Sequence, residues 1–527
     1  MKKILMTIWA AIMVLSMSTN TFAATVDNHT GHSYKAYQIF SGTQADGDAA
    51  LGDIEWGTGI EPVTFLYVLQ HDDRFKRGEE NIFMDCETAK DVAEVLNEYN
   101  EIAENFANAA DLHLTGVATE IAKDATDITL PAGYYLLVDT EEIADGTNGA
   151  RNSALLQLTN YYDIEMSKKY DLPTSDKDIT KVTDVNMNTK FEGTTEVVDA
   201  EIGDIIEFTL AARLPSNLND YEIYHFAFHD NLSEGMELLE TEDNIKIFRN
   251  GTEDITFYFE ISNEANEKGN LHIECEYLKD IYNLKNRDFI VVKYSAKLTD
   301  KAVIGSTGNP NTMYVEYSNN PNHDGDGQYG KTPEDEVIVF TYELDVNKVD
   351  GSSSDKLKDA EFVLLNADKT KVATVVNSVL TGWETVPTAG EDGKITWPAD
   401  TTLKSDANGQ FIIKGLDSAT YYLRETKAPA GYNLLTDDVK LVITATLTPD
   451  KDEEREADLT ALKIQVGDNG EQDGTLATGI VEANIANNKG AVLPETGGMG
   501  TTIFYIVGAV LVLGAGVFLV TKKRMEY

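Results

Sequence analysis

The stretch Tyr421-Tyr422-Leu423-Arg424-Glu425-Thr426 alternates apolar and polar side chains, and this period of two is typical of a β-strand. The alternation places Glu425 on the same face as Tyr421 and Leu423. Similar short segments occur on both sides of it, at residues 344–349, 360–365, 410–414, 441–447 and 480–485. This pattern predicts an antiparallel β-sandwich over residues 340–490.

Two more domains are predicted upstream of this sandwich. Residues 171–339 contain many short alternating segments, such as 205–211 and 289–297, and are predicted to form a second sandwich. Residues 24–168 have strand-like segments and one amphipathic helix, whose apolar face carries Val92, Leu96, Tyr99, Ile102, Ala103 and Phe106. The predicted fold class is all-β, with tandem Ig-like sandwiches and one helix inserted in the first domain.

The two ends of the chain predict export and anchoring. Lys2 and Lys3 precede an apolar run, and small residues follow it, so residues 1–23 are predicted to be a signal peptide. Near the other end, residues 503–520 contain no charge and are long enough for a transmembrane helix. The basic residues Lys522, Lys523 and Arg524 follow, which keeps this tail on the cytoplasmic side.

Charge and cysteine content narrow the function classes. The 527 residues carry a formal net charge of −46, which argues against nucleic acid and anionic membranes as partners. The two cysteines, Cys86 and Cys275, fall in different predicted domains, so an exported chain of this size must be stabilised without a disulfide.

A buried lysine offers such an alternative in the last domain. Lys348 shares a strand face with Val346 and would point into the core, where a lysine tends to lose its proton. Glu425 faces the same interior, and Asn487 in the final strand supplies an amide. A neutral amine, an acid and an amide carbonyl in a dry pocket are what a transamidation requires.

The residues around these positions resemble a known family. Asn347-Lys348-Val349-Asp350, residues 360–364 and residues 422–432 are similar to the collagen-adhesin B-type (CnaB) domain, with Asp359 where that family usually has Gly. The resemblance implies an intramolecular isopeptide bond between Lys348 and Asn487, with Glu425 as the catalytic acid. A structural Lys–Glu ion pair is the alternative interpretation.

The middle domain resembles a domain with the same kind of cross-link, in which an aspartate is the catalytic acid in place of the glutamate. Lys177 lies in the opening segment 173–179, and residues 229–236 resemble the pilin segment that carries the catalytic acid, here Asp230. Residues 309–321 resemble the closing strand, in which Asn319 would be the acceptor. Lys181 and Asn320 are the near alternatives, and a plain ion pair between Lys177 and Asp230 is the other.

The first domain lacks the acid. Residues 134–138 align with 421–425 of the last domain, and Val138 stands in the position of Glu425, so no isopeptide bond is expected there. Residues 164–170 resemble the pilin-motif region, where Lys169 is predicted to be the linking lysine. Lys168 is the substitute, and two solvated lysines without a role are the alternative.

The segment before the apolar helix resembles a sortase sorting signal, so residues 493–527 are predicted to direct cell-wall anchoring. Leu493-Pro494-Glu495-Thr496-Gly497 has the LPxTG form, and a sortase thiolate would attack the Thr496 carbonyl. The expected protein is a backbone (major) pilin of a Gram-positive surface pilus. It would be a structural subunit and not an enzyme, because its self-reaction turns over once.

The partners implied by this resemblance are a class C pilus sortase, a housekeeping sortase, other copies of the chain, minor pilins and peptidoglycan. The alternative is a minor or basal pilin, or a singly anchored adhesin that binds a host ligand. No cofactor or metal is expected: His225, His229 and Asp230 are interpreted as ordinary polar residues, and the loop at 323–327 lacks calcium-loop spacing.

Overall fold

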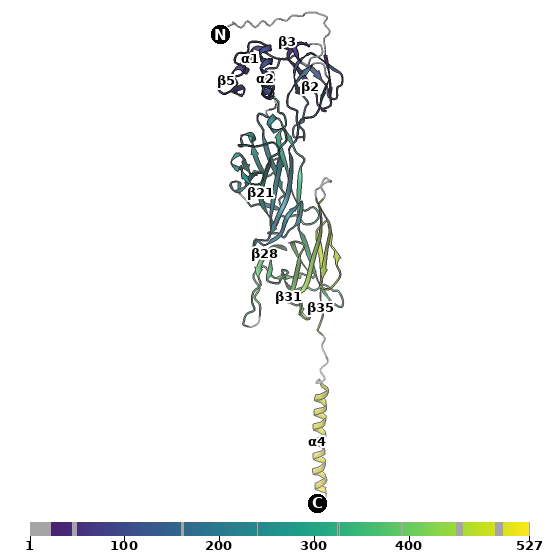
Figure 1. The fold of residues 1–527 in the computed structure, drawn as a ribbon. Helices are drawn as coiled ribbons and strands as arrows, with labels where there is room; N and C mark the ends of the chain where they lie inside the picture. The colour runs from purple at the N-terminus through teal and green to yellow at the C-terminus, as the bar shows by residue number, and fades with distance from the viewer. Residues whose placement is uncertain are drawn as a thin grey trace.

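The computed structural model describes residues 23–44, 50–159, 163–239, 241–323, 325, 327–391, 394–449, 457–490 and 499–525. Three strand-rich domains follow one another along an elongated molecule, and a long helix lies beyond the third (Figure 1). Almost all of the predicted signal peptide, and the whole of Leu493–Gly497, lie outside the described residues.

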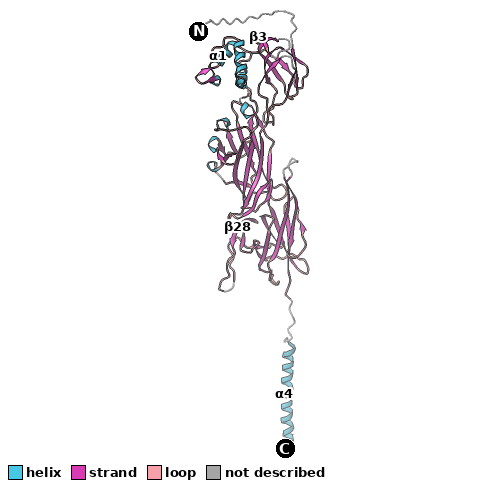
Figure 2. Cartoon of the chain, viewed as in Figure 1, coloured by secondary structure: helices cyan, strands magenta, loops and turns pink. Residues whose placement is uncertain are grey.

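The first domain combines two main sheets with a helical insertion that also contains the small two-stranded sheet β4-β5 (Figure 2). One sheet has the order β3-β2-β8-β9 with β6 added beside β2, and a smaller one has the order β10-β1-β7. Its strands are β1 (Ala23–Asn28), β2 (Tyr34–Gln44), β3 (Leu51–Trp56), β4 (Lys76–Arg77), β5 (Glu80–Asn81), β6 (Thr119–Ile121), β7 (Ile128–Pro131), β8 (Gly133–Asp139), β9 (Leu155–Thr159) and β10 (Ile164–Met166).

The prediction of one inserted helix is corrected, because the described part of this domain has three: α1 (Pro62–His71), α2 (Ala89–Glu98) and α3 (Ala103–Asp111). A capping box between Thr88 and Asp91 starts α2. Tyr99 then leaves the helical region with φ −118° and ψ 61°, so the predicted single helix is divided. The apolar face continues across this break, since Ile102 and Phe106 are both buried against the sheet.

The middle domain is a sandwich of two sheets. Their orders are β12-β11-β14-β21-β17-β18, with β16 beside β21, and β13-β24-β22-β15-β20-β19, with β23 beside β22. The strands are β11 (Thr174–Thr183), β12 (Thr189–Thr195), β13 (Val197–Asp199), β14 (Ile205–Arg213), β15 (Phe226–Leu232), β16 (Met236–Leu238), β17 (Lys246–Arg249), β18 (Glu253–Asp254), β19 (Glu260–Ser262), β20 (Leu271–Cys275), β21 (Phe289–Leu298), β22 (Asn309–Ser318), β23 (Tyr329–Lys331) and β24 (Asp335–Phe340).

The third domain follows directly, because only Thr341 separates β24 from β25. Its strands are β25 (Tyr342–Asp350), β26 (Glu361–Leu365), β27 (Lys371–Val376), β28 (Val379–Thr385), β29 (Leu403–Lys404), β30 (Gln410–Leu416), β31 (Thr420–Lys427), β32 (Val439–Pro449), β33 (Ala457–Val466), β34 (Gln472–Asp473) and β35 (Ile480–Asn487). The first and last strands of the domain, β25 and β35, are parallel neighbours, so residues far apart in sequence lie side by side.

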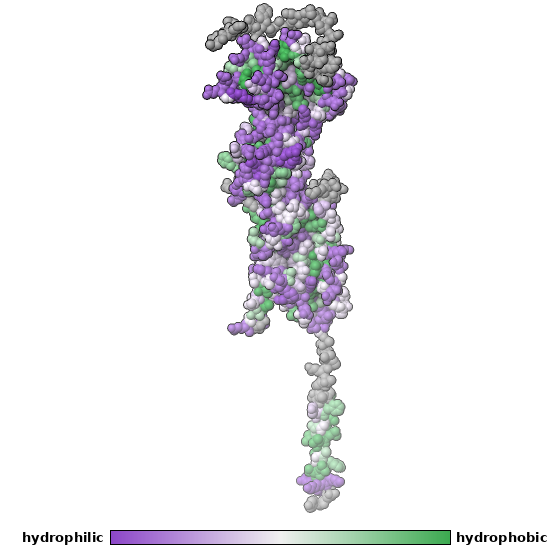
Figure 3. All heavy atoms as spheres, viewed as in Figure 1, coloured by the Kyte–Doolittle hydropathy of each residue, from purple (hydrophilic) through white to green (hydrophobic). Residues whose placement is uncertain are grey.

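The helix beyond the third domain is α4 (Met499–Met525). Its segment Ile503–Arg524 has a mean hydropathy of 2.7 and is long and apolar enough to cross a membrane. Figure 3 shows this contrast, with hydrophobic residues on α4 and mostly hydrophilic surfaces on the domains. The basic residues Lys522, Lys523 and Arg524 form its last turn, as expected for a membrane anchor with a cytoplasmic end.

Candidate functional site

The C-terminal domain holds the first of two buried lysine clusters. Lys348 lies on β25, whose inward face also carries Leu344 and Val346, and all three side chains are fully buried. The parallel register pairs Lys348 with Ile485 on β35, and Asn487 follows two residues later on the same face. Strand pairing therefore brings this amine and amide together.

The contacts in this cluster are close and specific. Lys348 Nζ contacts Asn487 Oδ1 and donates to the Ile485 carbonyl oxygen at 3.0 Å. Asn487 Nδ2 donates to Glu425 Oε2 at 2.9 Å and to the Asn433 carbonyl oxygen at 2.7 Å. Glu425 Oε1 lies 3.8 Å from Lys348 Nζ, with both side chains inaccessible to solvent. The structure thus brings together the three residues that the sequence proposed.

The electrostatic setting suits nucleophilic chemistry. Burial lowers the pKa of Lys348 to about 8, although the nearby Glu425 acts in the opposite direction. A substantial fraction of this amine is therefore neutral near physiological pH, and a neutral amine carries the lone pair that can attack a carbonyl carbon.

The second cluster lies between the sheets of the middle domain. Lys177 Nζ on β11 contacts Asp230 Oδ2 on β15, and Tyr294 Oη lies 3.1 Å from Lys177 Nζ and 3.0 Å from Asp230 Oδ2. The Lys177 and Asp230 side chains are fully inaccessible to solvent. Burial lowers the pKa of Lys177 and raises the pKa of Asp230, which favours a neutral amine beside a protonated acid.

The amide beside this pair is Asn311 and not Asn319. Asn311 Nδ2 donates to Tyr294 Oη at 2.7 Å, and its buried Oδ1 has no hydrogen-bond partner among the described residues. Asn319 lies eight residues later, roughly 26 Å along an extended strand, and its carbonyl oxygen accepts from Arg151 of the first domain at 2.8 Å. The Asn320 side chain donates to Gln328 Oε1 of the same domain at 3.2 Å, and not to the Lys177 cluster. Asn311 therefore replaces Asn319 as the candidate acceptor.

The choice between the two lysines of β11 also follows from the structure. A bulge between Ile179 and Lys181 interrupts the alternation, which leaves Lys181 half-buried while Lys177 points inward at Asp230. A signal for Asn311 was present in the sequence, since counting back in twos along β22 from Tyr317 reaches it on the inward face.

The predicted linking lysine lies at the junction of the first two domains. Lys168 and Lys169 are exposed and follow β10, and the Lys168 amine lies over the Tyr170 ring at 3.9 Å. Buried Asn152 Oδ1 accepts from the backbone nitrogens of Lys169 at 2.7 Å and Tyr170 at 3.0 Å. Asn152 itself donates to Asp139, so the backbone of the Lys169 segment is tied to the core of the first domain.

Val138 lies where the first domain would need an acid. It is buried on β8, and its register partner on β2 is Lys35. The Lys35 amine extends to Glu120 at the surface, 3.7 Å away. The aligned position of this domain therefore holds an apolar side chain, and the lysine in register with it extends toward solvent.

Comparisons with known proteins define the class. Residues 342–456 match a family model described as a prealbumin-like fold domain (SpaA), and residues 485–526 match the LPXTG cell wall anchor motif. With the strand-rich fold and the apolar α4, these matches define a cell-wall-anchored surface protein with a prealbumin-like sandwich domain.

A streptococcal surface protein is among the particular relatives. The chain is 26% identical over 421 residues to the trypsin-resistant surface T6 protein of Streptococcus pyogenes serotype M6, covering 68% of this chain and 70% of the relative. The solved structure of the T6 backbone pilin aligns with a TM-score of 0.50 and 17% identity, over 90% of this chain and all of that one, which shows a shared fold. These findings confirm the resemblance to sortase-assembled backbone pilins and support a structural pilus subunit.

Proposed function

We propose that this protein is the backbone subunit of a covalently polymerised surface pilus, and that each subunit is cross-linked internally by two isopeptide bonds. The observation that carries the proposal is the buried contact of Lys348 with Asn487 beside Glu425. A lone buried lysine is destabilising unless it is paired or has a chemical role. Here it lies against an amide carbonyl, which is an electrophile and not a countercharge.

The reaction at this cluster is a transamidation. The neutral Lys348 Nζ attacks the side-chain carbonyl carbon of Asn487, the new C–N bond forms, and the bond to Asn487 Nδ2 breaks. Glu425 Oε1 lies 3.8 Å from Lys348 Nζ and Oε2 accepts from Asn487 Nδ2, so this carboxyl is placed to take the proton that Nζ loses and to pass one to Nδ2, which leaves as ammonia. The product is one amide between β25 and β35, with no oxidant or cofactor required.

The middle domain would perform the same reaction between Lys177 and Asn311. Asp230 is the acid, and Tyr294 connects the three groups because its hydroxyl contacts all of them. The buried Oδ1 of Asn311, which has no partner among the described residues, would become the amide oxygen of the bond. The self-reaction happens once per molecule, so the protein acts as a structural subunit.

Polymerisation would use the two ends of the folded region. A class C pilus sortase would cleave after Thr496 and transfer this acyl group to Lys169 of the next copy. Lys169 is favoured over Lys168, because among the described residues its amine has no ion-pair or ring partner while that of Lys168 lies over Tyr170. A housekeeping sortase would join the finished polymer, with minor pilins, to peptidoglycan.

These bonds would set the path of a pulling force. Tension would enter at Lys169, cross the first bond from Lys177 to Asn311, continue through β24 into β25, and cross the second bond from Lys348 to Asn487. The strands between each pair of bonded residues would carry none of the load. The first domain would lie outside the path, which is consistent with its lack of an acid at Val138.

The Lys169→Arg substitution tests polymerisation, with Lys168→Arg as the matched control. Arginine keeps the charge and length, but its guanidinium remains protonated and is a poor nucleophile. We expect loss of the detergent-resistant ladder in cell-wall extracts for Lys169→Arg and an unchanged ladder for Lys168→Arg. A full ladder from Lys169→Arg would contradict this lysine, and single anchoring of the wild type would favour a minor pilin or adhesin.

A further inference from the structure

The outer face of the middle domain carries a histidine and carboxylate cluster that the pilus reaction does not use. Strand β15 pairs with β20 on one side and β22 on the other, and Ala227 lies between Glu274 and Glu316 in register. Ala227 is itself fully buried, and His225, Glu274 and Glu276 lie close to one another beside it. Among these, His225 has an exposed fraction of only 3%.

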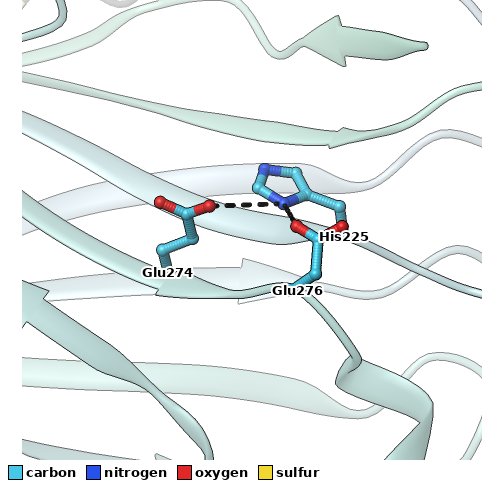
Figure 4. Close-up of side chains that lie close together, drawn as sticks. All are labelled: His225, Glu274 and Glu276. Carbon is cyan, nitrogen blue, oxygen red and sulfur yellow. Dashed lines mark hydrogen bonds and ion pairs between the residues drawn. The ribbon is translucent and has the colours of Figure 1, made fainter. Parts of the chain in front are cut away.

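The His225 ring points one nitrogen at two carboxylates (Figure 4). Its Nδ1 lies 3.1 Å from Glu276 Oε2 and 3.7 Å from Glu274 Oε1, and the three ligand atoms lie within 4.8 Å of one another. Zinc binds histidine nitrogen and carboxylate oxygen at about 2.0–2.2 Å, so tetrahedral ligand atoms lie roughly 3.3–3.5 Å apart. The spacing therefore suits one small cation.

The opposite nitrogen of the ring faces a third carboxylate. His225 Nε2 lies 3.3 Å from Glu316 Oε1, and Lys268 holds Glu316 from the other side with contacts of 2.9 and 2.8 Å. A metal-binding histidine usually directs its second nitrogen to a carboxylate, which fixes the tautomer and makes the first nitrogen a better ligand. His225 Nε2 makes no hydrogen bond among the described residues, so this nitrogen is available to carry the ring proton when Nδ1 binds a cation, with Glu316 as its nearest carboxylate.

The surroundings provide access and negative potential. A cavity of about 110 Å³ at the junction with the first domain is lined by His225, Glu276, Glu222 and Asp111. It has room for an ion and its water, and its carboxylates attract cations. An imidazole ligand with two carboxylates and a water suits zinc, whereas calcium and magnesium prefer oxygen alone.

We propose that His225, Glu274 and Glu276 bind one Zn²⁺ ion through Nδ1 and two carboxylate oxygens, with water in the fourth position. Glu316 is a positioning residue that acts through the histidine. The ion would clip β20 to the start of β15. These strands lie between β22, which carries the proposed bond, and the edge strand β19. The ion would therefore stabilise a part of the sheet that the covalent bond does not cross-link.

The test is zinc titration of the mature full-length chain, purified in detergent and stripped with chelator, against a chromogenic zinc competitor. We expect one tight site. The double substitution Glu274→Gln and Glu276→Gln keeps the shape of both exposed side chains but removes two carboxylate ligands. It should weaken zinc binding at least tenfold, because loss of a residue that only supports a ligand already causes a loss of about tenfold or more. The matched control is Glu79→Gln with Glu80→Gln, two exposed acids in the first domain, which should leave affinity unchanged.

Two further measurements separate this site from other zinc sites. Glu316→Gln should weaken zinc binding by roughly 10–100-fold without removing a ligand. Diffraction at the zinc absorption edge should give one anomalous peak beside His225 Nδ1. Equal affinity in the Glu274/Glu276 double variant, a peak elsewhere, no zinc binding, or tighter binding of calcium than of zinc would each overturn the proposal. A proton shared between His225 and Glu276 would then be the occupant.

Discussion

Asn487 Nδ2 donates a 2.9 Å hydrogen bond to Glu425 Oε2, while the Oδ1 atom of the same amide contacts Lys348 Nζ. The amide is thus held with its nitrogen toward the acid and its carbonyl toward the amine. An ordinary structural ion pair between Lys348 and Glu425 would not need an amide between them. This arrangement is the basis for the first two predictions.

Intact-mass measurement should find the mature chain lighter than its sequence by two ammonia molecules. Glu425→Ala removes the proton donor of the C-terminal cluster, so we expect a deficit of only one. Glu384→Ala, at an exposed position of the same domain, is the control and should keep both losses. An unchanged deficit in Glu425→Ala would show that this acid is not required.

The bond from Lys348 to Asn487 should stabilise the C-terminal domain strongly. It would close a loop with a sequence separation of 139 residues, and a cross-link over about 100 residues contributes about 4.7 kcal/mol in the chain-entropy description. Chemical denaturation of Glu425→Gln should therefore show the free energy of unfolding lowered by about 4–5 kcal/mol. A loss below about 1 kcal/mol would mean that the wild type has no such bond in this domain.

Asn311→Ala should abolish the ammonia loss of the middle domain. The reason is that Asn311 is the amide that contacts Tyr294, which also contacts Lys177 and Asp230. Peptide mapping of the wild type should recover a branched peptide that joins the segments of Lys177 and Asn311. Asn319→Ala serves as the comparison and should keep the branch; if Asn319→Ala alone removes it, the assignment to Asn311 is wrong.

Asn152→Ala should slow polymerisation without changing the nucleophile. Its side chain accepts from the backbone nitrogens of Lys169 and Tyr170, so its loss would release the segment that presents Lys169. We expect a several-fold lower initial rate of sortase-dependent polymer formation. Asn186→Ala, at an exposed turn, is the control. An unchanged rate for Asn152→Ala would show that this anchoring has no part in the reaction.

The interface between the middle and C-terminal domains should weaken as pH rises from 5 to 8. Lys190 Nζ lies 2.7 Å from Asp204, 2.9 Å from Asp417 and 3.1 Å from Glu201. Burial, and then the charge of Asp417, raise the pKa of Glu201 to about 7, while burial raises the pKa of Asp204 to about 6. Three carboxyls share one amine, so ionising all of them is unfavourable.

The sign follows from proton linkage. Folded-state pKa values above the unfolded ones give a stabilisation that is complete below about pH 4 and is lost as pH rises through about 6 to 7. Thermal unfolding should therefore show a higher Tm at pH 5.5 than at pH 8. Glu201→Gln, which cannot ionise, should reduce this difference. The same slope in the wild type and in Glu201→Gln would exclude the cluster as its cause.

Much of the fold and part of the site could be predicted from local patterns. Alternation along the chain identified the sandwiches, and the uncharged segment with its basic end identified the anchor helix. The same alternation placed Lys348, Glu425 and Asn487 on inward faces, because the period of a strand decides which side chains enter the core. The composition, with two separated cysteines, indicated that stability must come from another source.

Register and helix breaks could be resolved only in three dimensions. Local periodicity gives the face of a residue but not its partner across the sandwich, so the segment of β22 suggested Asn319 where the register selects Asn311. One helical pattern spanned Val92 to Phe106, but the backbone at Tyr99 divides it. Glu274 and Glu276 lie far from His225 in sequence, and only the pairing of β15 with β20 brings them to its Nδ1.

The sequence by itself therefore indicated which faces of the strands are buried and where the anchor helix lies, since these depend on hydrophobicity and period along the chain. The tertiary structure decided which buried groups meet. Those pairings depend on strand register and on the packing of two sheets, which bring together residues more than a hundred positions apart, such as Lys177 with Tyr294 and Lys348 with Asn487.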